Sequence, residues 1–403
     1  MRLFLLAALL LAMGIHGESK KPNIVLILID DLGLTDLQAF GGEIDTPNMD
    51  ALANGGMMFT NYHTTSECAP SRAMLLTGMD NHNTGLPMIP EVLPWKYHDT
   101  PGYEGYLRDD ALTIAEMLKP AGYKTYMTGK WHLAFGGRET AALPHNRGFD
   151  KTFILDATGG NNFNHHSYLP YYSESPWFKN GQETELPEDF YSSEFFVDQM
   201  IEFIDEDITD DAPFFSYVSF QAQHIPLQAP QEFINKYLDT YKAGWHDLRE
   251  KRKKQAVENG IFPSDKEIVD SLSSFDSWSV INDEDKKILV KSMAVFAGML
   301  DAMDFHIGRL IAYLKEQGLY ANTIFIVTAD NGPEGNDPSE HEAWRNWLKT
   351  TSYNRDYETL GGEDSYVFIG TEFAQAMASP SHLFTFHMSE GGLRVPLIIS
   401  GPG

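Results

Sequence analysis

The chain has 403 residues, with 30 Lys and Arg against 57 Asp and Glu, and a formal net charge of −27 at pH 7. This negative balance excludes nucleic acid as a partner, because phosphate backbones are bound by basic surfaces. A small anionic substrate would need a local positive centre, either a metal ion or a few placed Lys, Arg and His side chains, inside that field.

Residues 1–17 have the layout of a secretory signal peptide: Arg2, an apolar run from Leu3 to Met13, and small residues for cleavage. The alternative is a buried helix or a membrane anchor, but the run is short for a bilayer. We therefore expect an exported protein, periplasmic or secreted, with no stable membrane insertion, whose catalytic part spans 18–403.

Short apolar runs predict strands, and segments with apolar residues three or four apart predict helices. The strand runs lie within 22–33, 123–132, 214–224, 322–332 and 394–403, and the helical patterns within 112–119, 195–206 and 288–317. Strands that alternate with helices indicate βαβ units. The expected fold class is α/β, with a mostly parallel central sheet flanked by helices, as one large domain with insertions or as two domains.

Two segments interrupt this alternation. Residues 232–287 read as a helical insertion with a basic cluster at 249–254, which we expect to be a solvated helix face or, alternatively, a lid over the site. Residues 360–392 are rich in Gly, Ser and aromatic residues, and predict a long irregular connection near the site.

Polar residues end most of the predicted strands. Ligands of such sheets bind beyond the carboxyl ends of the strands. The residues in question are Asp30, Asp31, Lys130, His132, His224, Asp330 and Asn331. Three neighbouring carboxylates repel one another, and with an amide oxygen they favour a hard divalent cation, Ca²⁺ or Mg²⁺. The alternative is that the Asp-Asp and Asp-Asn pairs are turn and cap residues.

Cys68 is the only cysteine, so the chain forms no internal disulfide. Three interpretations are open. Cys68 is a small buried residue, or it is a thiolate nucleophile whose pKa is lowered by Arg72, with His132 or His224 as its base. The third interpretation comes from the surrounding string of residues.

The string C-A-P-S-R at 68–72, followed by L-L-T-G, resembles the signature of the sulfatase family, in which this cysteine is converted to formylglycine. "PNIVLILIDDLG", "GKWH", "TIFIVTADNG" and "EGGLRVPLI" are similar to landmarks of that family and occur in its order. The resemblance covers nearly the whole mature chain. It is to the formylglycine-dependent sulfatases of the alkaline-phosphatase-like superfamily, and most of all to secreted bacterial arylsulfatases.

The resemblance implies hydrolysis of aryl or alkyl sulfate esters, of small molecules or sugars, after maturation by a formylglycine-generating enzyme. It also implies one Ca²⁺ ion, held by Asp30, Asp31, Cys68 as formylglycine, Asp330 and Asn331. The hydrated aldehyde would attack sulfur, with Asp330 as activating base and Arg72 holding the diol. Lys130 would bind sulfate oxygens, His132 would take the proton that releases sulfate, and His224 would bind sulfate and help to protonate the leaving oxygen.

The sequence departs from the family pattern in two places. Relatives usually carry a lysine five residues before Glu390, whereas this chain has Thr385, with His387 two residues on as the candidate replacement in substrate binding. The chain also ends before the expected C-terminal subdomain. We therefore keep two alternatives: a phosphate or phosphonate ester hydrolase of the same superfamily, and a weakened, sulfatase-like binding protein.

Overall fold

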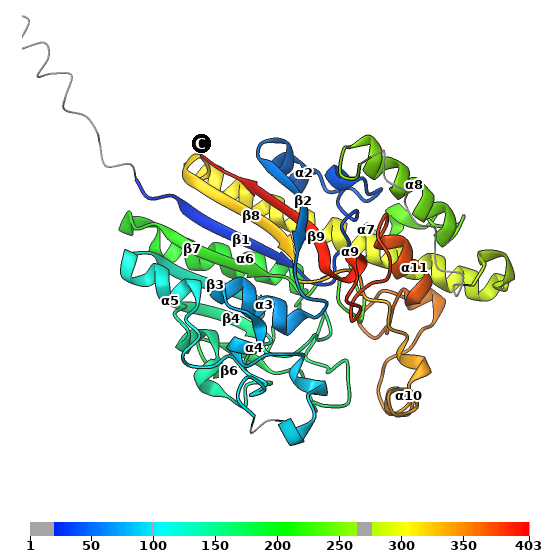
Figure 1. Ribbon diagram of the computed structural model, residues 1–403, viewed down its shortest axis with the longest axis horizontal. Helices are drawn as coiled ribbons and strands as arrows, with labels where there is room; N and C mark the ends of the chain where they lie inside the picture. The colour runs from blue at the N-terminus through cyan, green and yellow to red at the C-terminus, as the bar shows by residue number, and fades with distance from the viewer. Residues whose placement is uncertain (1–19, 98–99, 264–275, 403) are drawn as a thin grey trace, which may run out of the picture.

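The computed structural model describes residues 20–97, 100–263 and 276–402 (Figure 1). In this part of the chain nine strands form one sheet, in the order β2-β9-β8-β1-β7-β3-β4-β5-β6. The strands are β1 (Asn23–Ile29), β2 (Met57–His63), β3 (Lys124–Lys130), β4 (Lys151–Leu155), β5 (Trp177–Lys179), β6 (Gln182–Glu183), β7 (Phe214–Ser219), β8 (Thr323–Ala329) and β9 (Arg394–Ser400).

The sheet is parallel in its centre and antiparallel at both edges. Strands β8, β1, β7, β3 and β4 pair in parallel, whereas β9, β2, β5 and β6 join them antiparallel. The predicted α/β class is confirmed, and four of the five predicted strand runs lie in the parallel centre, whose remaining strand, β4, was not predicted. The fifth, in 394–403, is the antiparallel strand β9.

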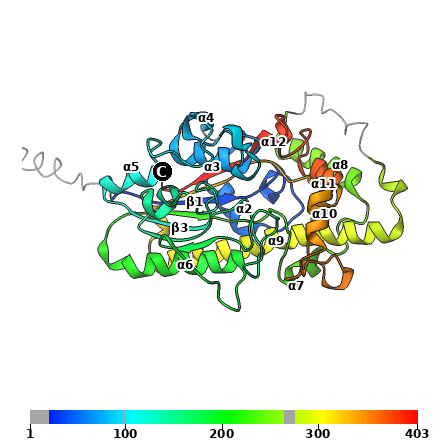
Figure 2. The same ribbon diagram turned by 90° about the horizontal axis from the view of Figure 1, so that it is seen from below.

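Helices cover both faces of the sheet. In the view from below, α6 and α9 lie on one side, and α3, α4 and α5 lie on the other (Figure 2). The helices predicted within 112–119, 195–206 and 288–317 correspond to α5, α6 and α9. The helices are α2 (Pro47–Asn54), α3 (Cys68–Thr77), α4 (Asn81–Thr84), α5 (Ile114–Leu118), α6 (Ser192–Asp207), α7 (Gln231–Ile234), α8 (Trp245–Glu258), α9 (Asp283–Glu316), α10 (Glu342–Leu348), α11 (Gly370–Met377) and α12 (Glu390–Leu393).

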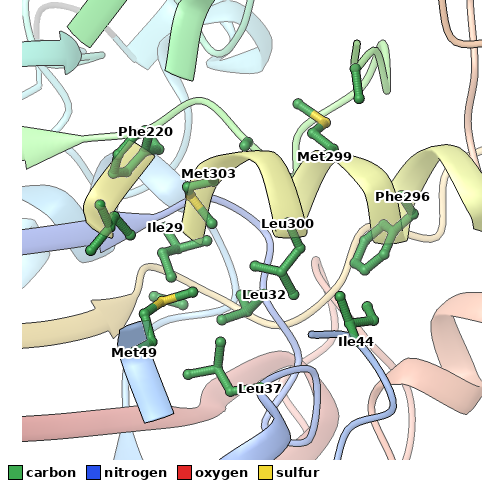
Figure 3. Close-up of a cluster of buried hydrophobic side chains, with 14 of the residues drawn as sticks. Ile29, Leu32, Leu37, Ile44, Met49, Phe220, Phe296, Met299, Leu300 and Met303 are labelled. Atoms are coloured by element: carbon green, nitrogen blue, oxygen red, sulfur yellow. The ribbon is translucent and has the colours of Figure 1, made fainter. Parts of the chain in front are cut away.

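The continuous apolar run of β1 follows from burial on both faces. Val25, Ile27 and Ile29 belong to the core on the α6/α9 side. Leu26 and Leu28 belong to the second core, on the α3/α5 side. Figure 3 shows Ile29 and Leu32 beside Met303 and Leu300 of α9. Each such side chain contributes about 1.5–3 kcal/mol when it is fully buried. The strand end that carries the site is therefore anchored on both sides.

The basic cluster of the predicted insertion is divided: Lys251 and Lys254 are exposed, as expected of a solvated face, whereas its two arginines are buried. Arg249 and Arg252 lie on the buried stripe of α8, together with Trp245, Leu248 and Ala256 at helical spacing. Arg249 donates to the carbonyl oxygens of Gln375 and Ser381, at 3.0 Å each. That expectation is wrong for these two arginines, because their charged groups have buried acceptors from distant segments. Residues 264–275 of the predicted insertion lie outside the described residues.

Arg252 forms the centre of a second buried group, the α8 ion-pair cluster, defined as Asp36, Glu43, Arg252 and Tyr241. Arg252 Nε is 2.8 Å from Glu43 Oε2, and Nη2 is 2.9 Å from Oε1. Its Nη1 donates to Asp36, and the Tyr241 hydroxyl donates to Glu43 at 2.8 Å. Every carboxylate oxygen of this cluster has a hydrogen-bond donor.

The predicted signal peptide, 1–17, lies outside the described residues. Within the described ranges, no helix combines the length and the apolar composition that a bilayer crossing requires. Even the 34-residue helix α9 carries charged residues along its length.

Candidate active site

The carboxyl ends of β1 and β8 bring four polar residues together. Ile29 and Ala329 are register partners at the last position of the two strands. Asp30 and Asp31 follow one strand, and Asp330 and Asn331 follow the other, so the two pairs lie side by side. The Asp31 amide donates to Asp330 Oδ1 at 3.2 Å. Asp31 has a φ of 52°, a left-handed conformation that costs a residue other than glycine about 1 kcal/mol.

Two cations from other elements complete this carboxylate cluster, defined as Asp30, Asp31, Asp330, Asn331, Arg72 and Lys130. Arg72 of α3 places Nε 2.8 Å and Nη2 2.7 Å from Asp330 Oδ2. Lys130, the last residue of β3, places Nζ 2.6 Å from Asp30 Oδ2. Arg72 Nη1 is held by the Lys130 carbonyl and by Ser219 Oγ, at 2.9 and 2.7 Å.

The charges of the carboxylate cluster do not balance, because three carboxylates face two cations. Burial, followed by the charge of Asp30, raises the pKa of Asp31 well above its usual range. Burial and Asp30 also raise the pKa of Asp330 to about 6, against the opposing effect of Arg72. These directions show that the protein alone stabilises the full negative charge poorly, and a divalent cation would correct the deficit.

Three oxygens of the cluster lack hydrogen-bond partners among the described residues: Asp30 Oδ1, Asp31 Oδ2 and Asn331 Oδ1. Ligand atoms of Asp30, Cys68 and Asp330 lie within 4.8 Å of one another, as do those of Asp30, Asp31 and His224. Orphaned, buried, hard oxygen donors fit Ca²⁺ or Mg²⁺. The residues present therefore suit a divalent metal, with Cys68 at the edge of the set.

Cys68 is the first residue of α3 and is 6% exposed. Its Sγ lies 3.3 Å from His132 Nδ1 and 3.8 Å from Thr158 Oγ1. Burial raises the pKa of the thiol, Lys130 opposes that rise, and Asp30, Asp330 and Asp31 add to it. This direction weighs against the thiolate alternative, and Arg72 is engaged by Asp330.

His132 is held between Cys68 and a glutamate. Its φ is 61°, another left-handed backbone at the site, which follows the buried Trp131. His132 Nε2 lies 2.9 Å from Glu91 Oε2, and both side chains are at most 3% exposed. Burial lowers the pKa of His132. Its Nδ1 is the ring nitrogen directed at position 68.

His224 lies opposite His132, five residues beyond β7. Its Nδ1 is 2.6 Å from the Ile225 carbonyl, which can only accept, so Nδ1 carries the proton of the neutral ring. Its Nε2 faces Thr158 Oγ1 at 3.3 Å and Asp31 Oδ2 at 4.0 Å. Burial lowers the pKa of His224 to about 4. The ring of Tyr168 packs edge-on against it, with the centroids 4.9 Å apart.

Thr385 lies beneath the carboxylate cluster. It is 4% exposed, and its Oγ1 accepts from Asn331 Nδ2 at 2.8 Å and donates to the Gly332 carbonyl. His387 lies on the same loop and contacts its own backbone, with Nδ1 3.2 Å from the Thr385 carbonyl. The structure thus places Thr385 against a predicted metal ligand, and the contacts of His387 are with Thr385 and the Phe384 ring.

A small cavity of about 190 Å³ lies beside the site and has Glu91 in its wall. It is lined by Glu91, Trp95, Phe135, Arg138, Tyr171 and Tyr172, among others. Tyr171 and Tyr172 belong to the aromatic segment 161–172. The Arg138 guanidinium lies 4.8 Å from the centroid of the Phe135 ring, and Trp95 is 72% exposed. This wall suits a planar aryl or sugar ring.

Sequence reasoning brought eleven candidate residues forward, and the structure places all but His387 in or against one buried site. It missed Glu91, Thr158 and Ser219. Thr158 follows β4, whose apolar run before Asp156 was the available signal for a further strand end. Ser219 is the last residue of the predicted strand β7. Glu91 lies in the 3-10 turn Pro90–Val92, where no periodicity indicates a functional side chain.

Comparison with known proteins gives a consistent family. The sulfatase family model matches residues 22–403. An uncharacterized sulfatase of Schizosaccharomyces pombe is 37% identical over 97% of this chain and 72% of its own. The arylsulfatase of Klebsiella aerogenes is 34% identical over 98% and 84%, respectively. The crystal structure of Ps i-CgsB in complex with k-i-k-neocarrahexaose superposes with a TM-score of 0.62 at 25% identity, covering 95% of this chain and 66% of that one.

Proposed function

The chain belongs to the sulfatase family of sulfuric ester hydrolases, and we propose that it cleaves aryl, alkyl or sugar sulfate esters with a formylglycine formed from Cys68 and one bound Ca²⁺. The observation that carries this proposal is the position of Cys68. It begins α3 inside the C-A-P-S-R string, and its Sγ lies among the ends of β1, β3 and β8 beside His132. The thiol itself is a poor nucleophile there, because burial raises its pKa.

The metal would be held by Asp30, Asp31, Asp330 and Asn331, together with the group at position 68. When bound, Ca²⁺ supplies positive charge next to the sulfate and lowers the cost of charge on its oxygens. Oxygen donors alone, without a thiolate or imidazole pair, suit Ca²⁺ better than Zn²⁺. This donor set weighs against the phosphate and phosphonate alternative in its two-zinc form.

A formylglycine at position 68 supplies, as its hydrate, one hydroxyl for attack on sulfur and a second whose proton is lost when sulfate leaves. Sγ of Cys68 marks about where an oxygen on the same Cβ would lie. Asp330 is the proposed base for the attacking hydroxyl. Arg72 holds that carboxylate in place with Nε and Nη2, which keeps its lone pairs directed at the site.

The remaining residues bind charge or move protons. Lys130 is fixed by Asp30 at 2.6 Å, so its ammonium is preorganised for sulfate oxygens. His132 Nδ1, which lies 3.3 Å from Cys68 Sγ, would take the proton of the second hydroxyl. In the neutral ring of His224, Nε2 carries no proton. A negatively charged substrate beside the ring favours protonation of Nε2. The protonated ring would then donate this proton to the leaving oxygen.

Sugar sulfates are included among the proposed substrates for two reasons. The structurally similar Ps i-CgsB is described with a bound neocarrahexaose. In this chain the cavity that has Glu91 in its wall offers aromatic faces and the Arg138 guanidinium. A signal peptide at 1–17 and export remain part of the proposal, as does maturation by a formylglycine-generating enzyme.

The test is hydrolysis of 4-nitrophenyl sulfate with Ca²⁺, using protein co-expressed with a formylglycine-generating enzyme. Peptide mass verifies formylglycine at position 68, and a Cys68→Ala variant is the control. Turnover that disappears in the control supports the proposal. Verified formylglycine without turnover, on this ester and on a panel of sugar sulfates, would leave the non-catalytic binding alternative.

A further inference from the structure

Glu91 is a buried carboxylate that the proposed chemistry does not use. Its side chain is 3% exposed, and its two oxygens meet three donors. Oε2 faces His132 Nε2 at 2.9 Å. Oε1 accepts from the Tyr172 hydroxyl at 2.9 Å and from the Thr158 amide at 3.2 Å. A buried carboxylate with so complete a set of donors remains ionised, and the pKa of Glu91 is about 2, because these contacts and the His132 ring outweigh burial.

The geometry fixes where the proton of His132 lies. A carboxylate can only accept, so Nε2 of His132 carries the proton that it shares with Glu91. The neutral imidazole has one N–H, so Nδ1 is left with a free lone pair. Nδ1 is the nitrogen that faces Sγ of Cys68 at 3.3 Å. The same ring in its other tautomer would direct an N–H at position 68 and could not take a proton from it.

We infer that Glu91 is a positioning residue that holds His132 in the tautomer with Nδ1 free, and that it stabilises the imidazolium formed when Nδ1 takes a proton from position 68. The part concerning proton transfer rests on the proposed function. The part concerning the tautomer rests only on the contacts of Glu91. Glu91 does not touch position 68 and acts through the imidazole, as the orienting acid of a catalytic triad does.

The substitution Glu91→Gln has a definite consequence here. The Thr158 amide is an obligatory donor to Oε1, so the carbonyl oxygen of the glutamine would occupy that place. Its NH₂ group would then face His132 Nε2, which must accept. The proton of the ring is thereby forced onto Nδ1. The exchange leaves side-chain volume unchanged, so the protein is expected to fold.

The first readout is the tautomer of His132 by NMR of the full chain labelled with ¹⁵N-histidine, with Cys68 unmodified and without Ca²⁺. A His132→Gln variant assigns the resonance. We expect a proton on Nε2 in the wild type and in Glu91→Asp, and on Nδ1 in Glu91→Gln. A Glu43→Gln variant, which removes another carboxylate with three donor contacts from the α8 ion-pair cluster, is the matched control and should leave His132 unchanged.

The second readout is kinetic, with matured enzyme and 4-nitrophenyl sulfate. Loss of the correct tautomer should lower kcat of Glu91→Gln by about 100-fold or more, with KM within about threefold, because Glu91 does not touch the sulfate. Glu91→Asp should recover part of kcat, and Glu43→Gln should retain it. A merely structural role would lower the melting temperature without moving the tautomer or separating kcat from KM.

The two readouts separate the inference from the proposed function. A folded Glu91→Gln variant that keeps the proton on Nε2, or that keeps wild-type kcat, overturns the inference. A different result is a wild type that shows the predicted tautomers and yet hydrolyses no sulfate ester. That result would overturn the proposed function, but Glu91 would still be the residue that fixes the tautomer of His132. If Glu91→Gln does not fold, Glu91→Asp decides, because a proton on Nδ1 in that variant contradicts the inference.

Discussion

The carboxylate cluster and the α8 ion-pair cluster are built from the same kinds of side chain, and both are buried. In the α8 ion-pair cluster each carboxylate oxygen has a donor from Arg252, Tyr241 or a backbone amide. In the carboxylate cluster three oxygens have no hydrogen bond among the described residues. Burial of charge alone therefore does not mark a functional site. What distinguishes a functional site is a set of buried acceptor oxygens without hydrogen-bond donors, because such oxygens are stabilised only when a ligand such as a metal ion binds to them.

The strongest test of this comparison is Arg252→Met. The change leaves the buried Asp36 and the half-buried Glu43 without their cation, so we expect a loss of about 3–5 kcal/mol in the free energy of unfolding. Denaturant titration of the purified variant measures it. The site itself is not altered, so any folded fraction should hydrolyse sulfate esters with wild-type kcat. A variant as stable as the wild type would show that the α8 ion-pair cluster is not structural.

Asp31→Asn should have the opposite effects to Arg252→Met: higher stability and lower activity. The change removes a carboxylate whose pKa burial and Asp30 raise, so the calcium-free protein should melt at a higher temperature. Activity should fall by about 100- to 1,000-fold, because a charged contact to the metal is lost. Thermal melts in EDTA and kcat with Ca²⁺ measure the two effects. A lower melting temperature in EDTA would mean that Asp31 stabilises the empty protein and that the comparison fails.

Asp156 lies between the two clusters in how well its charge is stabilised, because its carboxylate has hydrogen-bond donors but no cation. The donors are the backbone amides of Leu133, Ala134 and Gly137. Burial raises its pKa to about 6, above the value of about 4 in an unfolded chain. The folded state then holds the proton more tightly, so this group's contribution to stability falls as pH rises from 4 to 6, by up to about 3 kcal/mol. Relative to Asp156→Asn, the wild type should lose stability across that window, as measured by unfolding at each pH.

Thr385 gives the smallest expected effect. Its hydroxyl holds the Asn331 amide with the orphaned Oδ1 left for a metal. Thr385→Val keeps the shape and removes that hydrogen bond, so Ca²⁺ affinity by calorimetry should fall about tenfold. Thr385→Ser should retain it. Equal affinity in both variants would indicate that Thr385 does not orient Asn331, and would return it to the substrate-binding role predicted from its position before Glu390.

Much of this molecule could be predicted because its core strands obey a local rule. The runs that end in Asp30, Lys130 and Asp330 are largely buried on both faces, and their carboxyl ends meet at one edge once the strands pair in parallel. The central strand β4 and the strands β2, β5 and β6 nearer the edges escaped prediction. The last two have three and two residues, which is too short for a period to show.

The role of a residue could not be predicted from the sequence where that role depends on a partner far away in the chain. Arg249 and Arg252 read as a solvated basic face because their acceptors come from segments more than 100 residues away. Glu91 acquires its role only from the ring of His132, 41 residues on. The family pattern singled out Thr385 as a substrate-binding position, which stays a prediction, whereas its contact with Asn331 follows from the path of the loop, which sequence spacing does not determine.

The burial of the carboxylate cluster affects how fast a bound metal ion exchanges with solvent, rather than how tightly the ion is bound. Asp30, Asp31, Asp330 and Asn331 are at most 3% exposed, and Arg72 of α3 and Lys130 at the end of β3 bind two of them. An ion bound by these oxygens could exchange with solvent only when that part of the chain opens locally. Chelators should therefore strip the ion slowly, at a rate set by opening and nearly independent of chelator concentration. The enzyme would keep the metal with which it folded through long periods of metal scarcity.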